Sequence, residues 1–329
     1  PGDSAGWLAL ALLTQQPGGV APLNEEAVLD MAVRVAGEDV TLQRLLASRA
    51  LQREQWPEAV KWLVRLVEDQ NDAGAAQTLA ALTAQPAALA AMRSALKADS
   101  RWLLPVLAQT HRAHVVQAMP LVADALKLRL VPPATGQALM RNLKADGRWF
   151  DAHALWVYLV GGPVPLLFNG QFEQGFIADG FDWEVANTPP SLAGVQIFQP
   201  TLGARGRVLQ LEFSGKRIAQ PMARQIMVLL DGDYVLTGEY MARRMRTEQG
   251  LVWLINCAND GRELARTPPL IDTQGVWKKL QLPFTVPAGC GNAVVLQLRT
   301  SLGSEALAGM RGQMHFDNFS VVTGPVTPP

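Results

Sequence analysis

Reactive and metal-binding side chains are scarce in this sequence, which has two cysteines, four histidines and three tyrosines among 329 residues. Cys257 and Cys290 lack the neighbouring Cys and His residues of a zinc site. They are compatible with one disulfide in an oxidising compartment or with two buried thiols. The Gly-x-Ser-x-Gly elbow of hydrolases and the Gly-x-x-x-x-Gly-Lys-Ser/Thr phosphate loop are missing as well. We therefore predict a protein that is not an enzyme and holds no catalytic cofactor.

An excess of charge of either sign is also absent, because 29 Lys and Arg residues balance 29 Asp and Glu residues. The balance holds within each half of the chain, since residues 1–160 carry 15 basic and 15 acidic side chains. This excludes the basic surface expected of a nucleic-acid-binding protein and the polybasic segment of a membrane-surface protein. A neutral glycan or a protein surface is therefore favoured as a partner over a polyanion.

Long hydrophobic runs are missing too. A membrane-spanning helix needs ~20 predominantly apolar residues, and the apolar stretch over residues 154–168 is interrupted by Gly161, Gly162 and two prolines. We predict no membrane-spanning segment in this sequence. Because the sequence begins at Pro1 rather than at a methionine, a signal peptide or an anchor could precede it.

Apolar residues make up 49% of the sequence, which is enough for packed cores. The length exceeds the ~250–300 residues at which a single core stops growing, so two domains are expected. Residues 1–160 are typical of helices, since Gly is sparse and apolar residues recur at helical spacing. One such face follows Pro57, and it consists of Ala59, Trp62, Leu63, Leu66 and Val67. The preceding helix has a matching face, formed by Leu42, Leu45, Leu46 and Ala50.

The helical half contains a degenerate repeat. Trp56, Trp102 and Trp149 each follow a charged turn, and they lie 46 and 47 residues apart. Such spacing indicates stacked helical hairpins. The segments at residues 51–66 and 143–159 resemble the turn and second helix of a tetratricopeptide repeat, although the period is longer than the ~34 residues of that family. The resemblance implies an array that binds proteins; a helical domain that only packs against its neighbour is the alternative.

Past Phe168 the sequence changes to short β-branched and aromatic runs separated by Gly, Pro and Asp turns. Seven runs are predicted to be strands, at residues 207–213, 224–230, 234–241, 251–257, 277–284, 293–300 and 313–322. We therefore predict a two-domain fold in which an all-α helical-hairpin array is followed by an all-β jelly-roll sandwich. The predicted divisions are a helical domain at 1–160, a linker at 161–166, a sandwich at 167–323 and a tail at 324–329.

Five ordered landmarks in the second half resemble carbohydrate-binding modules of the galactose-binding-like superfamily. The first is Asn169-Gly170-Gln171-Phe172-Glu173 with a tryptophan after a short loop, and the last is His315-Phe316-Asp317-Asn318-Phe319. Between them lie the strand at 208–213, the Gly-x-Tyr-x-Leu strand at 232–236, and Trp277 with the Phe and Pro that follow it. The resemblance implies a sugar-binding sandwich without catalytic activity. It also implies a structural calcium ion held by Glu173 and Asp317; the alternative is that Glu173 caps a turn and Asp317 pairs with an arginine or a backbone amide.

Sugar binding requires aromatic rings that stack on the sugar and polar groups that orient its hydroxyls. The residues predicted to bind the ligand are Trp183, Glu239, Arg243, Trp253, Asn256, Gln297 and Arg299. Trp253 alternates with apolar residues, which is equally typical of a core position. Arg243 begins the only basic cluster, which either meets an acidic sugar or a partner's carboxylates, or forms a solvated strand end.

These features together predict an adaptor of the bacterial periplasm or cell envelope. Its helical array would bind a protein and its sandwich a poly- or oligosaccharide, in exopolysaccharide or surface-glycan biosynthesis or export. Two alternatives stay open. One is a protein-interaction scaffold whose sandwich has no sugar site, and the other is an accessory fragment of a larger glycan-active enzyme.

Overall fold

The computed structural model describes residues 4–13, 25–110, 115–177, 180–187, 189 and 192–324. The chain divides into two compact units, at residues 1–136 and 137–329. The predicted tail lies outside the described residues except for Gly324. Among the helices of the described part, none combines the length and the apolar character needed to cross a bilayer.

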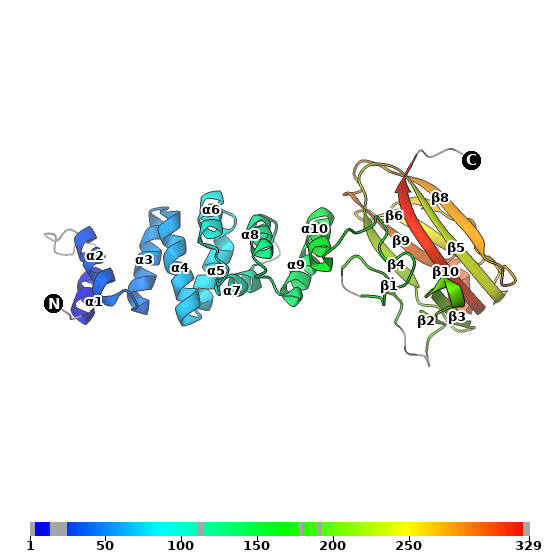
Figure 1. Cartoon of the computed structure of the whole chain (residues 1–329), viewed down its shortest axis with the longest axis horizontal. Helices are drawn as coiled ribbons and strands as arrows, with labels where there is room; N and C mark the ends of the chain where they lie inside the picture. Colours follow the sequence, from blue (N-terminus) through cyan, green and yellow to red (C-terminus); the bar gives the residue numbers. More distant parts are fainter. Residues whose placement is uncertain are drawn as a thin grey trace. The chain divides into compact units, whose positions relative to one another are not determined.

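The first unit is helical, and Figure 1 shows its helices following one another along the chain. These helices are α1 (Ser4–Leu13), α2 (Glu25–Ala36), α3 (Val40–Gln52), α4 (Trp56–Gln70), α5 (Ala73–Leu82), α6 (Pro86–Ala95), α7 (Leu103–Gln109) and α8 (Val115–Lys127). Each packs mainly on its near neighbours, as α4 does on α3, α5 and α6. The five apolar side chains predicted on one face of α4 are all buried. On α3 the matching face is buried at Leu42 and Ala50 and half-buried at Leu45 and Leu46.

The three repeated tryptophans mark the starts of helices. Trp56 and Trp149 are the first residues of α4 and α10 (Trp149–Val160), and Trp102 immediately precedes α7. The proline after Trp56 lies in the first turn of α4, where its missing N–H costs nothing. The sequence pattern therefore places the helix starts correctly.

The second unit contains α9 (Pro133–Ala145) from residue 137 on, together with α10, and a sandwich of two five-stranded antiparallel sheets, drawn in Figure 1 as two layers. The first sheet has the order β1-β4-β9-β6-β7, and its strands are β1 (Glu184–Val185), β4 (Ala223–Val228), β9 (Ala293–Thr300), β6 (Leu251–Cys257) and β7 (Glu263–Arg266). The second sheet has the order β2-β3-β10-β5-β8, and its strands are β2 (Val195–Phe198), β3 (Leu209–Ser214), β10 (Arg311–Thr323), β5 (Gly232–Arg246) and β8 (Lys278–Val286). The short elements η2 (Gly203–Arg205) and α11 (Gly303–Ala308) lie in connections between strands.

All seven predicted strands are present, and β6 and β9 have the predicted bounds. The chain passes from β4 in the first sheet to β5 in the second over residues 229–231. The core lies between the sheets, because alternate residues of each strand point inward. Its largest fully buried side chains include Trp183, Trp253, Phe172 and Phe316.

Helix α10 packs on the sandwich, which is why the second unit begins before the predicted linker. Trp156 meets Phe168 edge-on with ring centroids 4.8 Å apart, and it lies 5.6 Å from the ring of Phe181. Lys144 donates a 2.7 Å hydrogen bond to the Gly180 carbonyl. The chain leaves α10 at Gly161, whose left-handed backbone ends the helix where the predicted linker starts.

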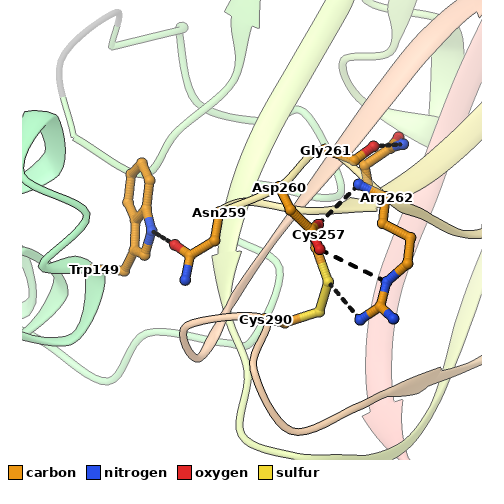
Figure 2. Close-up of a disulfide and its surroundings, with 8 residues drawn as sticks. Trp149, Cys257, Asn259, Asp260, Gly261, Arg262 and Cys290 are labelled. Carbon is orange, nitrogen blue, oxygen red and sulfur yellow. Dashed lines mark hydrogen bonds and ion pairs between the residues drawn. A yellow bond between two sulfur atoms is a disulfide. The ribbon is translucent and has the colours of Figure 1, made fainter.

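Cys257 and Cys290 form a disulfide, with their Cα atoms 5.0 Å apart. It joins the end of β6 to the loop before β9 (Figure 2). Close by, the Trp149 indole nitrogen donates to the Asn259 side-chain oxygen at 3.3 Å, so α10 also contacts the loop that follows β6. Of the two states that the sequence allowed for these cysteines, the structure has the disulfide.

Candidate functional site

The predicted ligand-binding residues fall into three separate places. Trp183 and Trp253 are 1% and 0% exposed, and their rings pack against each other in the core with centroids 5.7 Å apart. The prediction that they stack on a sugar is therefore wrong, and Trp253 has the core position that the sequence left open as its alternative. Tryptophan is common both in sugar-binding surfaces and in the cores of β-sandwiches, and here both rings lie in the core.

Asn256, Gln297 and Arg299 lie on the outer face of the first sheet, since their neighbours along β6 and β9 point into the core. Gln297 donates to the Asn256 side-chain oxygen at 2.8 Å. Arg299 donates through Nε to the Gln220 side-chain oxygen at 3.0 Å. The polar groups of this face therefore hydrogen-bond to one another.

Glu239 and Arg243 lie on the outer face of the second sheet, because Tyr240 and Ala242 between them point into the core. Glu239 accepts from the Arg205 guanidinium at 2.6 Å. Arg243, in contrast, makes no side-chain hydrogen bond or ion pair with any described residue. The five polar residues predicted from the sequence thus occupy opposite faces of the sandwich, and they do not form one site.

Arg243 belongs to a row of polar residues that crosses three strands. Gln313 on β10 pairs in register with Glu212 on β3 and with Arg243 on β5. The three residues line a pocket of about 430 Å³ together with Arg244 and the backbone at Gly312. Among the described residues, neither Glu212 nor Gln313 has a side-chain hydrogen-bond partner. We call Glu212, Gln313 and Arg243 the polar row.

A histidine lies beside the polar row on the same face. His315 is 4% exposed, and its Nε2 lies 3.1 Å from the Gln210 side-chain oxygen. Burial, reinforced by the charge of Arg243, holds the pKa of His315 below its ordinary value of 6.5. The imidazole is therefore neutral at pH 7 and adds a polar but uncharged group next to the row.

The carboxylates predicted to bind calcium have other partners. Asp317 is 2% exposed, and it is bridged by Arg205 at 3.2 Å and accepts from the Asn318 backbone N–H at 2.7 Å. Glu173 is exposed and accepts from the backbone N–H of Arg207 at 3.2 Å. This arrangement matches the alternative of a capped turn and an arginine pair.

The donor set does not fit a calcium ion. The guanidinium that contacts Asp317 would repel a cation there, and no group of three His, Cys, Asp or Glu side chains converges among the described residues. Burial raises the pKa of Asp317, and Arg205 together with the backbone N–H of Asn318 offsets part of that rise. Arg205 supplies the positive charge that the sequence resemblance assigned to a metal.

Glu212, Gln313 and Arg205 were not predicted as site residues. Alternation along β3 and β10 could have identified Glu212 and Gln313 as outward-facing, because they alternate with Leu211, Phe213 and Met314. The strand register that aligns them with Arg243 is not visible in the sequence, nor is the turn that brings Arg205 to Asp317.

No protein-family model matches the sequence, and no curated protein matches it. Structural similarity extends over about half of the chain. A CBM4 structure has 12% identity and a TM-score of 0.37, and the match covers 48% of this chain and 99% of that chain. A CBM22 xylan-binding domain from Paenibacillus barcinonensis has 14% identity and a TM-score of 0.33, covering 48% and 94%. A CBM61 structure in complex with β-1,4-galactotriose has 14% identity and a TM-score of 0.30, covering 49% and 100%. Similarities of this size do not establish a function for the chain.

Proposed function

We propose that the protein binds a glycan through the polar row on the outer face of the second sheet. The observation that carries the proposal is the contrast between the two faces. Polar side chains on the first sheet hydrogen-bond to one another, whereas Glu212, Gln313 and Arg243 have no side-chain partner among the described residues and line a pocket. Groups held in register without partners are available to a ligand.

The chemistry of the row suits sugar hydroxyls. A carboxylate accepts, a guanidinium donates, and a carboxamide does both, so the row offers each kind of hydrogen bond that a diol can make. The pocket volume of about 430 Å³ lies within the ~300–1,000 Å³ typical of small-ligand sites. The register of the polar row is set by the antiparallel pairing of β10 with β3 on one side and with β5 on the other. The three side chains are therefore positioned before a ligand binds.

Aromatic stacking contributes little to this site. Trp277 is only partly exposed, and the Arg205 guanidinium lies over its ring at 4.1 Å from the centroid. That cation–π contact occupies one face of the ring. Recognition therefore rests on hydrogen bonds.

A role without catalysis is part of the proposal. Glu239 and Asp317 are adjacent carboxylates on the same face, and Arg205 contacts both. Acid–base catalysis of glycoside hydrolysis needs two carboxyl groups that reach the substrate. Only 3% of the Asp317 side chain is exposed, so a substrate does not reach this pair.

The wider role that we propose is that of an adaptor in the bacterial periplasm or cell envelope. The helices of the first unit would bind a protein, and the sandwich would bind the glycan during exopolysaccharide or surface-glycan biosynthesis or export. The disulfide between Cys257 and Cys290 supports an oxidising compartment. The stacking of successive helices supports a protein-binding array.

The test is isothermal titration of the full chain with neutral oligosaccharides, including xylo-, cello- and galacto-oligomers. Gln313→Ala removes the carboxamide, the group of the row that both donates and accepts hydrogen bonds, and we expect the affinity for the oligosaccharide to fall about fivefold or more. Gln297→Ala is the matched control, because it makes the same change on the other sheet, and its affinity should equal that of the wild type. Arg243→Ala should behave like Gln313→Ala.

Two results would count against the proposal. One is equal loss of affinity in Gln297→Ala and Gln313→Ala, and the other is no binding of any oligosaccharide by a folded wild-type chain. The second result would favour the protein-interaction scaffold over the glycan-binding adaptor.

A further inference from the structure

A second cleft, of about 660 Å³, lies where the loop before β4 meets α11 and the end of β9. Its polar side chains are Arg217, Gln220 and Arg299, and its walls include Leu192 and Leu307. None of the polar row residues lines it. The cleft is therefore separate from the site proposed above.

The cleft carries local positive charge. Arg217 and Arg299 both line it, and among the described residues no Asp or Glu does. Arg217 is exposed and makes no ion pair or side-chain hydrogen bond with any described residue. The formal net charge of the chain is zero, so this positive charge is local to the cleft. Because no described carboxylate faces the two guanidiniums, the cleft favours an anionic ligand.

One of the two arginines is held in position by its neighbours. Gln220 donates to the Thr300 hydroxyl at 2.6 Å, and its side-chain oxygen accepts from Arg299 Nε at 3.0 Å. This clamp uses the Nε–H of Arg299 and leaves its two terminal nitrogens without a partner among the described residues. The terminal nitrogens of a guanidinium form the fork that binds a carboxylate.

The walls of the cleft are also held in place. The backbone N–H of Ile218 donates to the Ala306 carbonyl at 2.8 Å, which ties the loop before β4 to α11. Leu192 and Leu307 expose 71% and 64% of their surface. Apolar side chains beside a pair of guanidiniums suit a ligand that joins a carboxylate to a C–H-rich body.

We infer that this cleft binds the carboxylate of an acidic sugar, a uronic acid residue within the glycan. The inference rests on the proposed glycan-binding function and names the class of glycan. A uronic acid has the required parts, because its C6 carboxylate, attached to ring carbon C5, meets the guanidiniums while the ring C–H groups lie against the leucines.

The experiment titrates the full chain with an oligogalacturonate and with the same oligomer after its carboxyl groups have been reduced to alcohols. We expect the acidic oligomer to bind the wild type about tenfold more tightly than the reduced oligomer, and we expect added NaCl to diminish the difference. Arg217→Gln should abolish the preference, and Arg299→Gln should do the same. Arg207→Gln, an exposed arginine outside both sites, is the matched control and should keep the preference.

Melting temperatures of all variants show whether each is folded, and Arg217 is the safer position because its side chain has no described partner. Equal affinity for the two oligomers, or a preference that survives both Arg217→Gln and Arg299→Gln, overturns the inference. An acidic peptide that binds with the same dependence on Arg217 overturns the assignment to a sugar.

The two proposals fail in different ways. If neutral oligomers bind through Gln313 and the acidic oligomer binds no more tightly than the reduced one, the polar-row proposal is supported and the proposal of a uronic acid in the second cleft is wrong. If the acidic preference depends on Arg217 while Gln313→Ala has no effect on either oligomer, the cleft stands and the polar row falls. If a folded chain binds neither oligomer, both fall.

Discussion

Arg205 is the residue on which the buried charge of the second sheet depends. Its guanidinium contacts Glu239 and Asp317 and covers Trp277. Because Asp317 is almost fully buried, its ionised form needs this partner. The Arg205 side chain is about one-third exposed, so solvent weakens the pairing relative to a fully buried ion pair.

We expect Arg205→Met to lower the free energy of unfolding by about 1–3 kcal/mol at pH 7, a range set below the ~3–5 kcal/mol of fully buried pairs. The deficit should shrink as the pH falls toward 4, because protonation of Asp317 removes the buried charge that has lost its partner. Urea denaturation at the two pH values measures both quantities, and Arg205→Lys should restore part of the loss.

The same arrangement predicts how the chain responds to calcium. With a guanidinium on Asp317, the wild-type melting temperature should be the same in calcium and in chelator. A rise in calcium that disappears in Glu173→Gln would show instead that the metal site implied by the sequence resemblance exists.

At the scale of elements, the contact between α10 and the sandwich depends on one glycine. Gly180 has a φ of +100°, and a Cβ added there would lie 2.3 Å from the Trp156 indole nitrogen. An alanine would therefore strain the backbone and push on the ring that anchors α10.

We expect Gly180→Ala to destabilise the second unit by about 1–3 kcal/mol. Gly175→Ala is the matched control, because no atom of the described residues lies within 4 Å of its added Cβ, and it should change stability by less than about 0.5 kcal/mol. Thermal unfolding followed by calorimetry measures both. Equal melting temperatures for the two variants would show that the close approach of Gly180 to Trp156 does not limit which residue position 180 tolerates.

The elements also show what sequence patterns can and cannot predict. β6 and β9 were predictable to the residue because apolar-rich runs end there at turn residues. β1, β2 and β7 have two to four residues each and carry too short a pattern to be recognised. Trp183 and Trp253 were predicted to bind the ligand, with a core position as the alternative for Trp253, because residue type alone does not distinguish a core ring from a sugar platform.

At the scale of the whole molecule, the net charge of zero does not predict the local charge of each cleft. The balance of 29 basic and 29 acidic residues favoured a neutral ligand. The fold then separates the charges locally, since the polar row contains both signs while the described lining of the second cleft has two arginines and no acidic residue. A prediction from composition therefore applies to long-range attraction, and short-range recognition depends on strand register and loop contacts.

The central claim is that the polar row on the second sheet, rather than Asn256 and Gln297 on the first, binds neutral glycan, and two glutamines on opposite faces test it directly. The measurement is NMR of the side-chain amide resonances of Gln313 and Gln297 in the full chain during titration with the tightest-binding neutral oligosaccharide. The account predicts that the Gln313 resonances shift with saturation while those of Gln297, which stay hydrogen-bonded to Asn256, do not. Shifts at Gln297 without shifts at Gln313 would contradict it.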